Sequence, residues 1–126
     1  MTKVIVSKDC GNSPKNIFVE KLVIAIAKGD SKFMFASITD DIQWNFVGGR
    51  LIEGRENFVE AFEQMKKNKI LELSIDHITT HGKAGAADGK IKMESGKTFG
   101  FCDVFEFNGA KATGIRAITS YVIEVK

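Results

Sequence analysis

Residues 97–126 read KTFGFCDVFEFNGAKATGIRAITSYVIEVK, and this stretch decides the fold. It predicts two long strands joined by a tight turn at Asn108-Gly109, because Asn-Gly is the strongest two-residue hairpin signal. On the first strand, period-two alternation puts Asp103 on one face with Phe99, Phe101, Phe105 and Phe107. An ionised Asp in apolar surroundings is costly unless it is paired, hydrogen-bonded or protonated. We therefore expect this face to line a closed pocket.

The residues before this stretch alternate in the same way and extend the sheet. Period-two patterns predict a strand from Leu71 to Thr79 and another from Lys83 to Glu94. The pattern places His77 on the apolar face of the first of these strands. In the last strand it groups Ile115, Ala117, Thr119, Tyr121 and Ile123 on one face. An alternative interpretation makes Asp88-Gly89 a hairpin turn, which would leave two very short strands.

Helices are predicted in the first half of the chain. Ser13-Pro14 is a helix start, with Ser as the N-cap and Pro in the first turn, and this helix should end near Lys28. A short second helix follows to about Ser37, and a third begins after Gly54. Between them, 42–47 and 51–52 are predicted strands. The order predicts an α+β domain with three helices on one face of a curved antiparallel sheet.

Length and composition bound the function. A chain of 126 residues is one domain, 1–126, in which 1–12 form a flexible arm or an edge strand. The net charge of +2 favours no nucleic-acid partner. No apolar run is long enough for a membrane span or a secretory signal, so we expect a cytoplasmic protein.

No cofactor or metal site is predicted. Neither phosphate-loop motif, GxGxxG or GxxxxGK[ST], is present. His77 and His81 lie four positions apart, which on a strand is ~13 Å and too far for shared coordination of one metal ion.

Several motifs, in their order and spacing, carry a resemblance to a known superfamily. They are AKGD at 27–30, ITDDI at 38–42, EGRE at 53–56 and FCDVFEFNG at 101–109. With these motifs the chain resembles the nuclear transport factor 2-like superfamily, also called SnoaL-like or ketosteroid-isomerase-like, over about residues 14–126. The resemblance implies a cone-shaped barrel with a deep apolar pocket.

The resemblance also implies homodimers that meet through the sheet. Outward-facing apolar residues fit this interface: Cys102, Val104, Ile118 and Val122. Ketosteroid isomerase uses an Asp base with a Tyr and a protonated Asp as oxyanion donors. Asp103 matches the protonated Asp. The base would fall near Asn45-Phe46, where no carboxylate stands, and the first helix has no Tyr, so steroid isomerisation is not expected.

Asp103 has two interpretations. It is either a raised-pKa acid that donates a hydrogen bond to a ligand, or a structural acceptor for Tyr121, Thr119 or His77. His77 is either a catalytic base in the pocket or a wall residue. The remaining predicted ligand-binding residues are apolar or aromatic for the most part: Trp44, Phe46, Phe58, Phe62, Phe101, Phe105, Ala117, Thr119 and Tyr121.

Three functional classes remain open at this point. The first is a binding protein for a small apolar or aromatic molecule with one polar group. The second is an isomerase, cyclase or dehydratase that works without a cofactor by acid–base chemistry, with Asp103 as the acid and His77 as the base. The third is a dimeric interaction module with a filled core. A fold alone does not choose among them.

Overall fold

A computed structural model describes residues 2–109 and 114–126 of the chain. Helices and strands follow one another as β1 (Lys3–Val6), a short 3-10 helix η1 (Lys8–Cys10), α1 (Pro14–Lys28), α2 (Ser31–Ser37), β2 (Ile38–Phe46), β3 (Leu51–Glu53), α3 (Arg55–Met65), β4 (Ile70–His81), β5 (Ala84–Met93), β6 (Thr98–Phe107) and β7 (Ile115–Val125). The predicted α+β class with three helices is confirmed. Within the segment 1–12, which the sequence predicts as an arm or an edge strand, Lys3–Val6 form β1 at one edge of the sheet.

Capping residues define the starts of α1 and α2 and the end of α1, as the sequence predicts. Ser13 Oγ accepts a hydrogen bond from the backbone N–H of Asn16, 3.2 Å away, at the start of α1. Gly29 ends α1 in the left-handed region, with φ of 71°. Asp30 then caps α2 by accepting from the N–H of Phe33 at 3.1 Å. Within the described part of the chain, no helix has the length and apolar content needed to cross a bilayer.

The strands form one seven-stranded sheet in the order β1-β4-β5-β6-β7-β2-β3. Strands β4 to β7 make the expected antiparallel meander. The sheet as a whole is mixed, however, because β1 runs parallel to β4 and β2 runs parallel to β7. Alternation along a strand does not indicate the direction of a partner that lies far away in the sequence.

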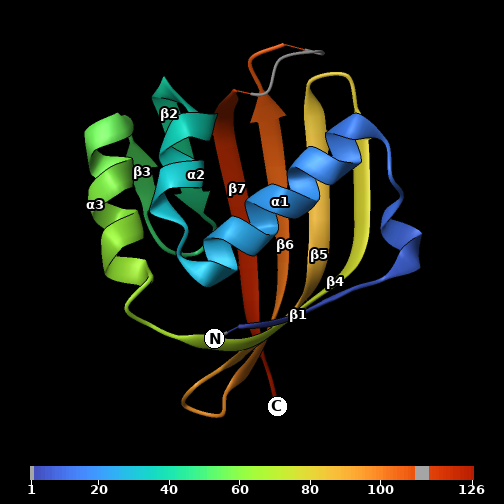
Figure 1. Cartoon of the computed structure of the whole chain (residues 1–126). Coiled ribbons are helices and arrows are strands. Elements are labelled where there is room, and N and C mark those ends of the chain that lie inside the picture. The colour runs from blue at the N-terminus through green and yellow to red at the C-terminus, as the bar shows by residue number, and fades with distance from the viewer. Residues whose placement is uncertain (1, 110–113) are drawn as a thin grey trace.

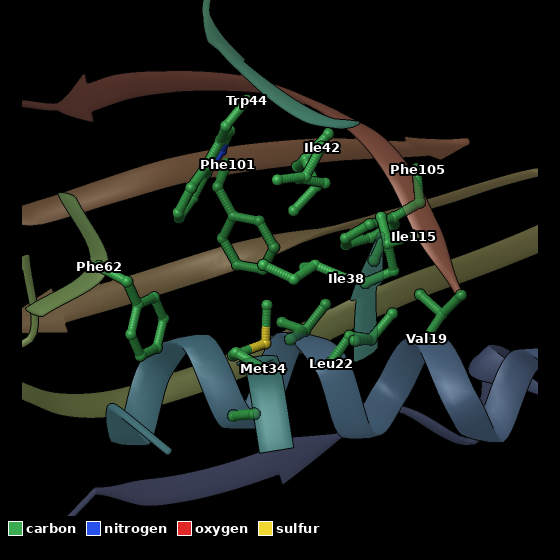
Figure 2. Packing of buried hydrophobic residues seen from close by; sticks show 14 of the residues in the cluster. Val19, Leu22, Met34, Ile38, Ile42, Trp44, Phe62, Phe101, Phe105 and Ile115 are labelled. Carbon is green, nitrogen blue, oxygen red and sulfur yellow. The ribbon is translucent and has the colours of Figure 1, made fainter. Parts of the chain in front are cut away.

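The helices cover one face of this sheet. Figure 1 shows α1 lying across the meander strands, while α2 and α3 lie beside β2 and β3. Buried apolar side chains of α1 and α2, including Leu22 and Met34, face those of the strands, including Ile42 and Phe105 (Figure 2). The core therefore lies between the helices and the concave face of the sheet, which we call the inner face.

A β-bulge in β4 changes which side chains face the core. Ile75 pairs with Gly89 and His77 pairs with Asp88, so Asp76 is an extra residue between two consecutive pairs. Ile75 and Ile78 are both buried as a result, and Asp76 and His77 are both exposed. The prediction that His77 shares a face with Ile75 is wrong, because the bulge inverts the alternation beyond it.

A second bulge does the same in β7. Phe107 pairs with Ile115 and Glu106 pairs with Ala117, which leaves Arg116 as the extra residue. Beyond this point Ile118 and Ser120 are buried, whereas Tyr121 is 46% exposed. The predicted inward set of Ala117, Thr119 and Tyr121 therefore lies on the outer face.

The structure excludes the alternative turn at Asp88-Gly89 and changes the predicted turn at Asn108-Gly109. Asp88-Gly89 is no turn, because β5 continues through it. At Asn108-Gly109 a two-residue hairpin would pair the residues on either side of the turn. Instead, the N–H of Asn108 donates to the carbonyl oxygen of Gly114 at 3.0 Å, so the connection is longer. Residues 110–113 of this connection lie outside the described residues.

Gly89 is the residue that makes room for the bulge in β4. A Cβ atom at this position would lie 1.9 Å from the carbonyl oxygen of Ser74, far inside van der Waals contact. Gly100 on β6 provides a matched control, because the nearest atoms to a Cβ there would be 3.9 Å away.

We predict that Gly89→Ala lowers the free energy of unfolding by about 3 kcal/mol, because backbone must move to accept the new methyl group. Gly100→Ala should change it by less than about 1 kcal/mol. Urea unfolding followed by circular dichroism measures both. Equal stabilities of the two variants would contradict the bulge geometry.

Candidate functional site

Asp103 lies in the middle of β6 and points to the inner face, as the sequence predicts. Its partners across the sheet are Ala87 on β5 and Ser120 on β7. Only 8% of the residue is exposed. Pairing along β6 is regular from Thr98 to Glu106, so the alternation that places Asp103 with Phe101 and Phe105 is preserved.

A chain of hydrogen bonds holds one oxygen of this carboxyl group. Trp44 Nε1 donates to Ser120 Oγ at 2.9 Å, and Ser120 Oγ donates to Asp103 Oδ1 at 2.6 Å. All three residues are buried and come from β2, β7 and β6. The partner of Asp103 is thus Ser120, and not Tyr121, Thr119 or His77 as expected.

The second carboxyl oxygen, Oδ2, has no hydrogen-bond partner among the described residues. Every fully buried polar side-chain atom of these residues does have a partner. Asp103 Oδ2 is therefore not fully buried, and Asp103 is one of the residues that line a partly open cavity. The wall of this cavity thus contains a carboxyl oxygen that has no hydrogen-bond partner among the described residues.

Burial raises the pKa of Asp103 from 3.8 to about 6, because the anion loses its hydration in the apolar wall. The hydrogen bond from Ser120 acts in the opposite direction and stabilises the anion. A carboxyl group with this pKa exchanges its proton in the range of physiological pH, which suits it for hydrogen bonding or proton transfer to a ligand.

The cavity beside Asp103 has a volume of about 260 Å3. Except for Asp103, Ser120, Lys66 and Asn68, its lining is apolar: Val23, Ile26, Ala27, Trp44, Phe46, Phe62, Met65, Ile70, Leu73, Ile91, Met93, Phe99, Phe101 and Val122. The inward Gly85 does not contribute to this space, since Phe107 and Val19 fill the position of its missing side chain at 3.2 Å.

The predicted site residues fall into three groups. Asp103 and the predicted aromatic residues Trp44, Phe46, Phe62 and Phe101 line the cavity together. Two others, Phe58 and Phe105, are fully buried in the core instead. Phe58 stacks on Trp44 with ring centroids 5.0 Å apart, so it supports the cavity wall without reaching the cavity.

The third group lies outside the cavity, on the outer face of the sheet. It contains Ala117, Thr119, Tyr121 and the predicted base, His77. The imidazole of His77 is 67% exposed and contacts Asp88 Oδ1 at 2.9 Å. This carboxylate raises the pKa of His77 above its ordinary value. The two residues predicted as a catalytic pair thus lie on opposite faces of one sheet.

Sequence reasoning missed Ser120, Val122 and other lining residues such as Met93. Ser120 follows the bulge at Arg116, and the alternation that was extended from Ile115 assigned it to the wrong face. The sequence did contain one chemical indication of the role of Ser120. A buried acid needs a hydrogen-bond partner, and Ser120 is the hydroxyl directly across from Asp103 in the observed register.

The remaining polar lining residues, Lys66 and Asn68, lie in the connection between α3 and β4. Lys66 Nζ is paired with Glu63 at 2.8 Å and with Ser31 Oγ at 2.9 Å. Cys102 points away from the cavity, and burial raises the pKa of its thiol, which disfavours the reactive thiolate. Among the residues that the structure describes, no three His, Cys, Asp or Glu side chains are grouped so that they could hold a metal ion.

The titration of Asp103 should appear in the stability of the protein. The folded protein binds this proton with a pKa of about 6, against 3.8 for the ordinary carboxyl group. The resulting stabilisation is complete below pH 3.8 and is lost as the pH rises through about 6. At ~1.4 kcal/mol per pH unit, the loss is about 3 kcal/mol.

We predict that the stability of the wild type relative to Asp103→Asn falls by about 2 kcal/mol between pH 4 and pH 8, because the Asn variant cannot titrate at this position. Urea unfolding of both proteins across this range measures the difference. A difference that stays constant with pH would show that the carboxyl group is not desolvated.

Comparison with known proteins agrees with this architecture. A family model for the SnoaL-like domain matches residues 19–115. No match to the chain was found among curated protein sequences. A similar solved structure is an NTF2-like protein of unknown function from Cytophaga hutchinsonii, with a TM-score of 0.69, 23% identity and coverage of 85% of this chain and 97% of that one.

Two further similar structures are described as enzymes. An LEH-like epoxide hydrolase of M. tuberculosis has a TM-score of 0.71 and 23% identity, with 84% of this chain and 80% of that one covered. A proposed ketosteroid isomerase from Kribbella flavida has a TM-score of 0.73 and 11% identity, with 87% and 78% covered. These likenesses establish a shared fold. The family match over most of the chain shows that this protein belongs to the SnoaL-like domain family, within the nuclear transport factor 2-like superfamily.

Proposed function

We propose that this protein binds a small apolar molecule that carries one polar group, with the polar group at Asp103. The observation that carries this proposal is the unpartnered Oδ2 of a buried acid in a largely apolar cavity. Ligand sites of this kind combine an apolar lining with a few placed polar atoms. The cavity of about 260 Å3 argues against a function that depends on a solidly filled interior.

The volume limits the size of the ligand. A cavity of about 150 Å3 in another protein holds benzene, so about 260 Å3 corresponds to roughly ten carbon atoms. The aromatic walls formed by Trp44, Phe46 and Phe62 favour flat or cyclic skeletons. A bicyclic hydrocarbon with one oxygen atom fits both limits.

An enzyme on such a ligand is the second candidate. The pKa of about 6 for Asp103 favours it, as do the similar folds of an epoxide hydrolase and a proposed ketosteroid isomerase. The single acid argues for simple binding, because His77 lies on the other face and Lys66 is already paired. Mass spectrometry of a bound ligand after incubation separates a binder, which returns it unchanged, from an enzyme.

We predict that tetralin, a ten-carbon bicyclic hydrocarbon, binds saturably and that Ala27→Phe weakens this binding at least about tenfold, because the new ring occupies the cavity that Ala27 lines. Ala84→Phe adds the same ring at an exposed outer position and should leave the affinity unchanged, as should His77→Gln. Isothermal titration calorimetry measures all four proteins. Equal binding by Ala27→Phe would place the ligand elsewhere.

We also propose that two copies associate through the outer face of β6 and β7. Of the interface residues predicted from the sequence, Ile118 is buried in the core and Val122 lines the cavity. Cys102 and Val104 do lie on the outer face. Exposed apolar side chains beside them, Tyr121 and Ile123, extend the patch.

We predict that the double substitution Tyr121→Glu and Ile123→Glu shifts the protein from dimer to monomer, because two buried like charges on each copy oppose association. Lys67→Glu, at an exposed position away from the sheet, is the control. Sedimentation velocity measures the masses. A wild type that sediments as a monomer at micromolar concentration would contradict the proposed interface.

A further inference from the structure

The hydrogen-bond chain behind Asp103 has a direction, because its first member can only donate. The indole Nε1–H of Trp44 has no acceptor capacity, so Ser120 Oγ accepts from it at 2.9 Å. The single hydroxyl proton of Ser120 then lies toward Asp103 Oδ1, 2.6 Å away. Oδ1 is thereby an acceptor, and the acid proton of neutral Asp103 is left on Oδ2.

The opposite arrangement would leave a buried donor without a partner. If Oδ1 carried the acid proton and donated it to Ser120, the hydroxyl of Ser120 would accept twice. Its own proton would then lack an acceptor among the described residues, and Ser120 is only 4% exposed. An unsatisfied buried donor costs roughly 1–3 kcal/mol, so the proton is held on Oδ2.

We infer that Trp44 and Ser120 are positioning residues that turn Asp103 Oδ2 toward the ligand as a hydrogen-bond donor, and that the ligand class is therefore a small apolar ketone, aldehyde or ether. The inference rests on the proposed binding function and specifies its ligand. A ligand oxygen that only accepts matches the donor that Asp103 presents to the cavity.

The charges around the cavity make the donor form depend on pH. Lys66, at the end of α3, is the one other charged side chain among the described lining residues, and it is paired with Glu63. The lining residues of α1, β2, β4, β5 and β7 carry no charge. No cation therefore stabilises the anion of Asp103 in the cavity, and the neutral donor form prevails below a pH of about 6.

The test compares tetralin with 2-tetralone, which has the same bicyclic skeleton and one carbonyl oxygen. Calorimetry at pH 5 should give the wild type an affinity about tenfold higher for the ketone, the value of one buried hydrogen bond. At pH 8 this preference should vanish, because ionised Asp103 has no proton to donate. The readout is the ratio of the two affinities. A change in cavity shape that weakens the binding of both probes equally leaves this ratio unchanged.

Two variants test the positioning role. In Trp44→Phe, Ser120 is free to accept from Oδ1, so the acid proton can turn away from the ligand and the ketone preference at pH 5 should fall to about twofold or less. In Asp103→Asn, the amide oxygen can still accept from Ser120 while Nδ2 donates into the cavity. This variant should keep the ketone preference and lose its dependence on pH, which a merely structural role would not produce.

The outcomes separate the two proposals. Binding of neither probe to the wild type overturns the proposed function, and the inference with it. Equal binding of both probes at pH 5 leaves the proposed function standing and overturns the inference. An undiminished ketone preference in Trp44→Phe overturns the positioning role, and near-ultraviolet circular dichroism of that variant verifies that its core is intact. If Trp44→Phe does not fold, the Asp103→Asn result still tests whether a donor at position 103 causes the ketone preference.

Discussion

Taking the carboxyl group of Asp103 out of water is the constraint around which this interior is arranged. Phe101 and Phe105 flank it on β6, and α1 covers the same face. The desolvation is only partly offset by the hydrogen bond from Ser120, and Trp44 fixes that hydroxyl in turn. The consecutive strands β6 and β7 are therefore joined to β2, which is distant in sequence, at one polar point inside an apolar core. A fold that separated β2, β6 and β7 would leave the acid without its partner.

The two β-bulges determine which side chains surround this point. The bulge at Arg116 brings Ser120 to the inner face beside Asp103. The bulge at Asp76 sends His77 to the outer face, where it pairs with Asp88. One extra residue in each strand thus adds a hydroxyl to the cavity and removes an imidazole from it. The cavity therefore contains a single acid with a fixed hydrogen-bond partner, and not the acid–base pair that the sequence predicts.

This arrangement illustrates how a shared fold accommodates different chemistry. The chain belongs to the SnoaL-like family, and proteins with similar folds include an epoxide hydrolase and a proposed ketosteroid isomerase. What the fold supplies is the cavity between α1 and the inner face of the sheet. What this sequence supplies is one buried acid, a donor-only indole and a wall of aromatic side chains. The function depends on these residues and not on the fold, since one fold hosts many activities.

The sequence by itself determined the helix ends, the meander and the inward position of Asp103. These follow from local chemistry: capping residues at Ser13 and Gly29, and a period of two along β6, whose pairing is regular. Only the tertiary structure decided the partner of Asp103, the side on which His77 lies and the location of the cavity. The physical reason is that a bulge inverts the alternation beyond it, and its position depends on a neighbouring strand. At Asp76 that neighbour is Gly89, whose missing Cβ admits the carbonyl oxygen of Ser74.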